Sequence, residues 1–136
     1  MKKTQVAVLG ATGMIGQRFV QLLEDHPYFE IGGLYASERS EGKTLAEVLR
    51  LKGVRFHQET LSMRIEALEP KAIGRRCRAA FSGLPSEVAG DYETSLAEEG
   101  VAVFSNAASH RMDQDVPLLI PEVNPDHLDM VRGQGT

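Results

Sequence analysis

The chain is poor in cysteine and in aromatic residues. Its 136 residues include one cysteine, Cys77, and no tryptophan, so an internal disulfide is excluded and a reducing compartment fits. No apolar run is long enough to cross a membrane, and the N-terminal residues lead into a predicted strand without a signal sequence. A formal net charge of -4 disfavours non-specific binding to nucleic acid. We therefore expect a cytoplasmic protein that binds neither membranes nor nucleic acid.

Glycine, in contrast, recurs at a regular spacing near the N-terminus. Three glycines spaced three apart follow the apolar run 6–9, and an amphipathic segment begins at once. A strand, a tight turn and a helix in this order form the phosphate-binding unit of dinucleotide-binding domains. Glycines permit positive φ and the close approach of a pyrophosphate, while the helix N-terminus offers free N–H groups. A purely structural strand-to-helix turn is the alternative. The candidate cofactor residues here are Gly10, Thr12, Gly13, Met14, Ile15 and Gly16.

Strands and helices are predicted to alternate along the chain. The expected strands are residues 5–9, 29–36, 78–82 and 101–104. The expected helices are 14–25, with Ile15, Phe19, Leu22 and Leu23 on its apolar face, and one that starts at an N-cap, Ser86, and ends at Gly100. Between residues 44 and 68 we expect a short helix at 45–49 and short strands at 54–57 and 61–65. This alternation predicts a Rossmann-like, doubly wound α/β fold, a mostly parallel sheet with helices on both faces. Residues 1–136 would form one dinucleotide-binding domain.

The loop after the second predicted strand bears on the choice of cofactor. NAD-binding domains usually place a carboxylate at the end of this strand to hold the ribose hydroxyl, but Ala36 and Ser37 stand there. Arg39 and Ser40 follow, and a guanidinium with two hydroxyls suits a 2′-phosphate. The pattern therefore favours NADP. Glu38 leaves NAD open, and a loop that is merely solvated is a further alternative.

Neither a metal site nor a catalytic nucleophile is expected. The four histidines show no metal-ligand spacing with one another or with Cys77. Arginines beside Cys77 favour a reactive thiolate, but this residue precedes its predicted strand. Ligands of open α/β sheets bind at the carboxyl ends of strands. Cys77 is thus interpreted as a structural or surface thiol, whereas His110, next to Arg111, stays open as a site residue.

Three later segments carry a resemblance to a known family. They are residues 81–90, 104–113 and 116–128, which read FSGLPSEVAG, FSNAASHRMD and VPLLIPEVNPDHL. Together with the glycine turn and residues 36–40, they resemble aspartate-semialdehyde dehydrogenase of the archaeal and fungal branch. The resemblance implies NADP-dependent reductive dephosphorylation of aspartyl phosphate, a step that feeds lysine, methionine and threonine synthesis.

The resemblance also implies roles for individual residues. The pyrophosphate would contact Thr12, Gly13, Met14 and Ile15, and the 2′-phosphate would contact Ser37, Arg39 and Ser40. The nicotinamide side would be formed by Gly83, Leu84 and Pro85. Asn106 and Arg111 would bind the phosphate of the acyl-phosphate substrate, with a salt bridge from Arg111 to Asp113 or Asp115 as the alternative. The parent protein would be a homo-oligomer.

The 136 residues depart from the family in one respect. They contain neither the Asn-Pro-Asn-Cys segment with the family's nucleophile nor the histidine of its second domain. We therefore expect a cofactor domain without the catalytic and dimerisation domain, inactive by itself. Two alternatives stay open. One is a stand-alone dinucleotide-binding regulatory module, and the other is the cofactor domain of N-acetyl-glutamyl-phosphate reductase.

Overall fold

The computed structural model describes residues 2–134, which form a parallel sheet flanked by helices. The strands are β1 (Thr4–Leu9), β2 (Phe29–Ala36), β3 (Ile65–Ala67), β4 (Ala79–Ser82) and β5 (Ala102–Ser105). They are ordered β3-β2-β1-β4-β5, and every neighbouring pair is parallel. The chain winds from β1 toward one edge and then returns to the other, so β1 and β4 flank the topological switch point where such folds bind ligands. The predicted doubly wound α/β fold is confirmed.

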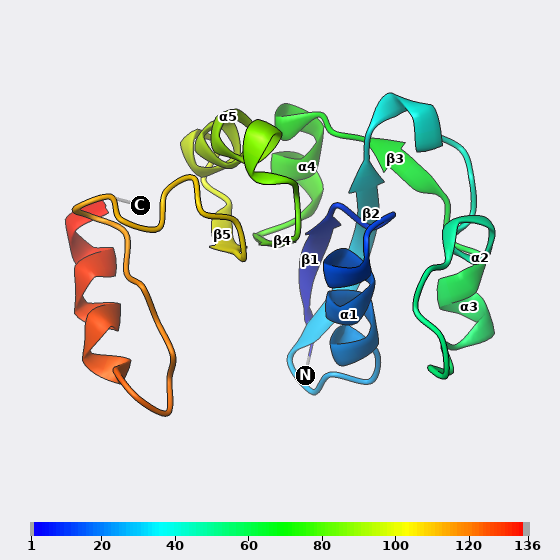
Figure 1. The fold of residues 1–136 in the computed structure, drawn as a ribbon, viewed down its shortest axis with the longest axis horizontal. Coiled ribbons are helices and arrows are strands. Elements are labelled where there is room, and N and C mark those ends of the chain that lie inside the picture. The colour runs from blue at the N-terminus through cyan, green and yellow to red at the C-terminus, as the bar shows by residue number, and fades with distance from the viewer. Residues whose placement is uncertain (1, 135–136) are drawn as a thin grey trace.

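Helices cover both faces of this sheet (Figure 1). The longer ones are α1 (Met14–Leu23), α4 (Pro70–Arg76) and α5 (Ser86–Glu98), and the short ones are α2 (Leu45–Val48) and α3 (Gln58–Leu61). Helices α4 and α5 lie on one face, and α1 lies on the other together with α2 and α3. None of the helices that the structure describes is long and apolar enough to cross a membrane.

Strand β1 is buried on both faces and divides the core in two. Val6 and Val8 belong to the cluster beneath α1, whereas Ala7 and Leu9 belong to the cluster beneath α4 and α5. Successive side chains of a strand point to opposite faces, so a continuous apolar run is what a doubly covered strand requires. This run therefore places the β1–α1 turn at the centre of the sheet's carboxyl edge.

Helix α1 differs from the prediction in the face it buries. Ile15 and Leu22, expected in the core, are 47% and 65% exposed. The buried positions are Gly16, Gln17, Val20 and Leu23, and the helix ends at Leu23 rather than at residue 25. Packing of Gly16 against the preceding turn fixes the rotation of the helix, and periodicity alone could not reveal that contact.

The segment between β2 and α4 is less regular than predicted. The expected short helix is present as α2, but residues 54–57 are coil, and α3 and β3 replace the strand expected at 61–65. Main-chain bonds explain where β3 forms, because Gly42 donates to the Ile65 carbonyl at 2.8 Å and Ile65 donates to that of Lys43 at 2.7 Å. Residues 54–57 have no neighbouring strand with which to pair.

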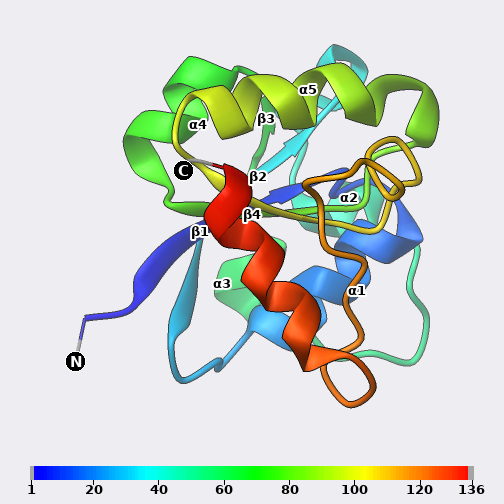
Figure 2. The same ribbon diagram turned by 90° about the vertical axis from the view of Figure 1, so that its left-hand side faces the viewer.

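The chain after β5 runs along the outer edge of the sheet. Residues 106–124 are mostly loop, and a 3-10 helix, η2 (Pro125–Gln134), follows. Figure 2 looks from this side and shows η2 in front of the strands. Gly100 has the positive φ expected at the end of α5, but Ser86 is the first residue of α5 and Pro85 is its N-cap, so the predicted cap is wrong.

Candidate cofactor site

The β1–α1 turn is a close crossing of three glycines. Gly10 has a φ of +79°, and a Cβ there would lie 2.8 Å from the Gly83 carbonyl oxygen. A Cβ at Gly16 would overlap the Gly10 carbonyl, and one at Gly83 would lie 2.9 Å from the Gly16 nitrogen. Side chains are therefore excluded at all three positions by backbone contact, which brings the start of α1 against the end of β4.

Gly13 differs from these three, because it has room for a side chain. Its φ of -98° and ψ of 165° are extended, and a Cβ would meet only the Gly10 carbonyl oxygen, at 3.5 Å. Positive φ, which the turn glycines were expected to permit, is thus needed at Gly10 and not at Gly13. Gly13 is the N-cap of α1, and the space above it is open for a ligand.

The N-terminus of α1 is suited to an anion. Within the described residues, no side chain caps this helix and its first turn holds no acidic residue. Met14 is 60% exposed, so the helix begins at the surface of the molecule. Unpaired N–H groups and the positive end of the helix dipole attract phosphates. Thr12, half-buried in the turn, borders the same space.

The end of β2 lies beside this turn. Gly10 and Ala11 both donate to the Tyr35 carbonyl, at 2.8 and 3.1 Å. After β2 the chain forms a short 3-10 turn, η1 (Glu38–Ser40), for which Ser37 is the N-cap. Glu38 and Arg39 are exposed, and Arg39 forms no ion pair in the part of the chain that the structure describes. The Arg39 guanidinium therefore has donors available for an anion.

The loop after β4 approaches the turn from the other side. The Gly83 N–H donates to the Leu9 carbonyl at 2.9 Å, so Gly83 extends the pairing of β4 with β1. The Leu84 side chain is buried in the cluster beneath α4 and α5, whereas Pro85 is exposed. Leu84 can thus offer a ligand only its backbone, whereas the Pro85 ring is accessible.

The loop after β5 brings Asn106 and Arg111 together. Asn106 donates its N–H to the Ser82 carbonyl at 3.0 Å, and the Arg111 guanidinium donates to the Asn106 carbonyl at 3.3 Å. Among the described residues Arg111 forms no salt bridge with Asp113 or Asp115, and Asp113 pairs with His110. Arg111 retains donors for an anionic ligand.

Two buried polar side chains, Gln17 and Glu93, form hydrogen bonds that hold the chain around the site. The sequence analysis identified neither of them. The Gln17 amide donates to the carbonyls of Ala11 and Val48 and accepts the N–H groups of Arg50 and Leu51. The Glu93 carboxylate accepts hydroxyl hydrogen bonds from the ends of β4 and β5. One signal was available for Gln17, which stands on the same helical stripe as Val20. None was available for Glu93, whose partners are remote in sequence.

The sole thiol is buried at the opposite end of β4. Cys77 is 2% exposed and precedes the strand, as expected for a structural thiol. Burial raises the pKa of the Cys77 thiol and outweighs the neighbouring Arg76, so the thiol is held in its unreactive, protonated form. The described residues contain no cluster of histidine, cysteine and acidic side chains that could hold a metal ion.

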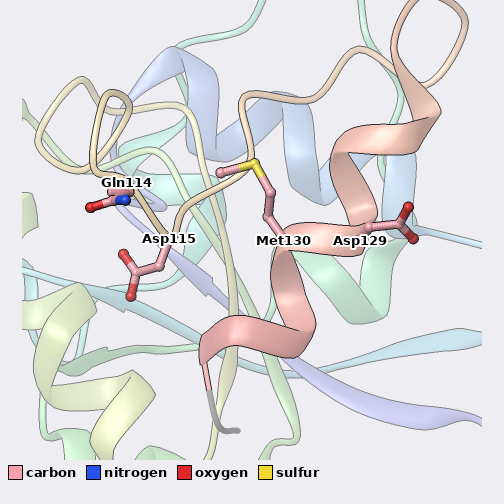
Figure 3. A pocket seen from close by; sticks show the side chains of 4 residues that line it. All are labelled: Gln114, Asp115, Asp129 and Met130. Carbon is pink, nitrogen blue, oxygen red and sulfur yellow. The ribbon is translucent and has the colours of Figure 1, made fainter.

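A hollow of about 530 Å3 near η2 does not serve as the cofactor site. It is lined by Gln114, Asp115, Asp129 and Met130. Figure 3 shows Met130 reaching toward the loop, while Asp129 points away from Gln114 and Asp115. Polar groups do not converge there, in contrast to the open N–H groups of α1.

Comparison with known proteins is consistent with this geometry. Residues 5–131 match the family model described as semialdehyde dehydrogenase, NAD binding domain. Aspartate-semialdehyde dehydrogenase of Candida albicans is 44% identical over 98% of this chain and 37% of the relative. That of Methanothermobacter thermautotrophicus is 45% identical over 95% and 37%. The chain thus spans a little over a third of these relatives.

Solved structures of two relatives superpose on the chain. The Candida albicans aspartate-semialdehyde dehydrogenase with NADP has a TM-score of 0.89 at 42% identity, and the match covers 94% of this chain and 36% of that one. Aspartate-semialdehyde dehydrogenase II of Vibrio cholerae, complexed with ASA, has a TM-score of 0.77 at 28% identity, with 98% and 40% covered. The resemblance to fungal and archaeal enzymes is confirmed, and the chain belongs to the semialdehyde dehydrogenase family as its NAD-binding domain.

Proposed function

We propose that this chain binds NADP as the cofactor domain of an aspartate-semialdehyde dehydrogenase. The observation that carries the proposal is that the uncapped α1 N-terminus lies beside the end of β2, which leads directly into the η1 turn with Arg39. Two fixed features that favour anions are thereby present for a cofactor with a pyrophosphate and a 2′-phosphate. The NADP complex of the Candida albicans relative supports the same choice.

The proposed reaction is the reductive dephosphorylation of aspartyl phosphate in lysine, methionine and threonine biosynthesis. Bound NADPH supplies the hydride. In this chain Thr12 to Ile15 hold the pyrophosphate, Ser37, Arg39 and Ser40 hold the 2′-phosphate, and the loop 83–85 borders the nicotinamide. Asn106 and Arg111 bind the phosphate of the substrate. The relatives favour aspartyl phosphate over N-acetyl-glutamyl phosphate.

The rest of the assignment belongs to the same proposal. A nucleophilic cysteine and an acid–base histidine come from a separate catalytic domain, because the chain's own thiol lies at the wrong end of β4. The parent protein is a cytoplasmic homo-oligomer. The matched segment covers 36–37% of these relatives, which is consistent with such a second domain.

Calorimetric titration of the chain with NADP and with NAD tests the cofactor assignment. We expect NADP to bind roughly a hundredfold more tightly, because two hydrogen bonds to a charged phosphate are worth about 1.5–3 kcal/mol each. Arg39→Ala should remove most of this preference. Arg55→Ala is the matched control, since Arg55 is exposed and precedes α3. Equal affinities would refute the assignment and indicate Glu38 as a ligand of the ribose.

A further inference from the structure

Helix α5 carries a buried carboxylate that the proposed function does not use. Glu93 is 4% exposed and is the one charged side chain among the buried residues that the structure describes. Its Oε2 accepts a hydrogen bond from Ser82 Oγ at 2.7 Å and another from Ser105 Oγ at 2.6 Å. Burying a carboxylate costs free energy unless hydrogen bonds replace those it made to water. The hydroxyls of Ser82 and Ser105 supply these hydrogen bonds to Glu93.

The two serines lie at a functionally sensitive place. Ser82 is the last residue of β4, Ser105 is the last residue of β5, and the two are directly paired in the sheet. The loop 83–85 leaves from Ser82, and the loop with Asn106 and Arg111 leaves from Ser105. A single oxygen of α5 therefore fixes the origins of both loops.

The same helix also supports the second loop farther along. Ser105 Oγ accepts the Ala107 N–H at 3.0 Å, which turns the chain directly after β5. Ser109 Oγ donates to the Ser86 carbonyl at 3.1 Å, and His110 contacts the Gly90 carbonyl at 3.1 Å. The loop is thus bonded to β5 at its start and held against α5 at Ser109 and His110.

We propose that Glu93 is a positioning residue that sets the spacing between the nicotinamide side of the site and the substrate-phosphate loop. This inference rests on the proposed function. Glu93 touches neither ligand, and it acts through the hydroxyls of Ser82 and Ser105. The opposite end of the site, formed by Ser37 and Arg39 after β2, is held by other contacts. Loss of the carboxylate therefore affects one end of the cofactor and spares the other.

Two ligands separate these ends in a calorimetric titration of the chain. NADPH spans the whole site, whereas adenosine 2′,5′-bisphosphate has no nicotinamide and occupies the end near Arg39. We expect Glu93→Ala to weaken NADPH binding about tenfold and to leave the bisphosphate affinity within about twofold. Glu93→Gln retains an acceptor oxygen of similar shape and should restore most of the NADPH affinity. Glu98→Gln, an exposed carboxylate of the same helix, is the matched control.

Other results of this titration would contradict either the role of Glu93 or the proposed function, and the two cases can be distinguished. Equal weakening of both ligands, or no change in either, would overturn the positioning role of Glu93. A wild-type chain that binds neither ligand would instead refute the proposed function. If Glu93→Ala does not fold, Ser105→Ala provides the test, because it removes one donor at an exposed strand end. That variant should weaken NADPH about threefold and spare the bisphosphate, and an unchanged NADPH affinity would overturn the proposal.

Discussion

Two kinds of glycine meet at the β1–α1 turn. Gly10, Gly16 and Gly83 are required by backbone packing, because a Cβ at any of them would collide with another part of the crossing. Gly13 meets no such obstacle and has an extended backbone that any residue adopts. Packing therefore explains the glycines at positions 10 and 16, whereas it does not explain Gly13, for which we propose a role in binding.

Gly13→Val should abolish cofactor binding without unfolding the chain. The new side chain would occupy the open space above the α1 N-terminus, where the pyrophosphate is proposed to lie. We expect no measurable NADP binding, with the melting temperature changed by only a few degrees. Calorimetry and thermal unfolding measure the two quantities.

Gly16→Ala is the contrasting variant at the same turn. Its Cβ would overlap the Gly10 carbonyl, so a large loss of stability is expected before any effect on binding can be measured. A Gly13→Val chain that binds NADP normally would show that the turn has only a structural role.

At the scale of the element, α5 serves as the support for the loop after β5. His110 ties this loop down, since its Nδ1 lies 2.7 Å from Asp113 Oδ2 and its Nε2 lies 3.1 Å from the Gly90 carbonyl. A ring that donates to both acceptors carries two protons. The hydrogen bond to Asp113, followed by that to Gly90, raises the pKa of His110 above 6.5, and the more distant Glu93 charge acts in the same direction.

This attachment should depend on pH. A folded-state pKa above the ordinary value means that the contribution to stability is complete below pH 6.5 and is lost as pH rises through the raised pKa. The NMR titration of the His110 ring should report a pKa above 6.5, and Asp113→Asn should bring it down. Asp115→Asn, which removes a nearby carboxylate without touching the ring, is the control. A wild-type ring that titrates at or below 6.5 would contradict the proposed contacts.

At the scale of the whole molecule, the described residues bring the proposed cofactor and anion contacts to one edge of the sheet and leave the thiol at the other. Cys77 is buried, and burial raises its pKa. Reductive dephosphorylation needs a thiolate, a proton-transfer group and phosphate contacts in one place. The 136 residues alone should therefore show no turnover.

A chimera provides the positive control for that prediction. In it, these residues replace the matching segment of the Candida albicans relative. Phosphate-dependent reduction of NADP with aspartate semialdehyde is the assay, and activity is expected from the chimera alone. Turnover by the 136 residues that disappears in Cys77→Ser would show that the placement of the thiol is misinterpreted.

Short sequence patterns correctly predicted those elements whose structure is determined by residues close together in the chain. The β1 run and the glycine turn are examples, since their periodicity and spacing are contained in thirteen consecutive residues, 4–16. The hydrogen-bonding roles of Gln17 and Glu93 could not be identified in this way, because all their partners except Ala11 lie more than ten residues away in the chain. The strand expected at residues 54–57 failed for the related reason that strand formation requires a partner, which sequence alternation does not supply.

The arrangement of the turn has a consequence for protein engineering. Residues 37–39 are exposed and contribute nothing to either core cluster, so a mutant library at these positions can explore cofactor preference at little risk to folding. The glycine crossing allows no such exploration, because its three members constrain one another. A library that randomised both together would consist mostly of misfolded variants, and its inactive members would reveal nothing about cofactor recognition.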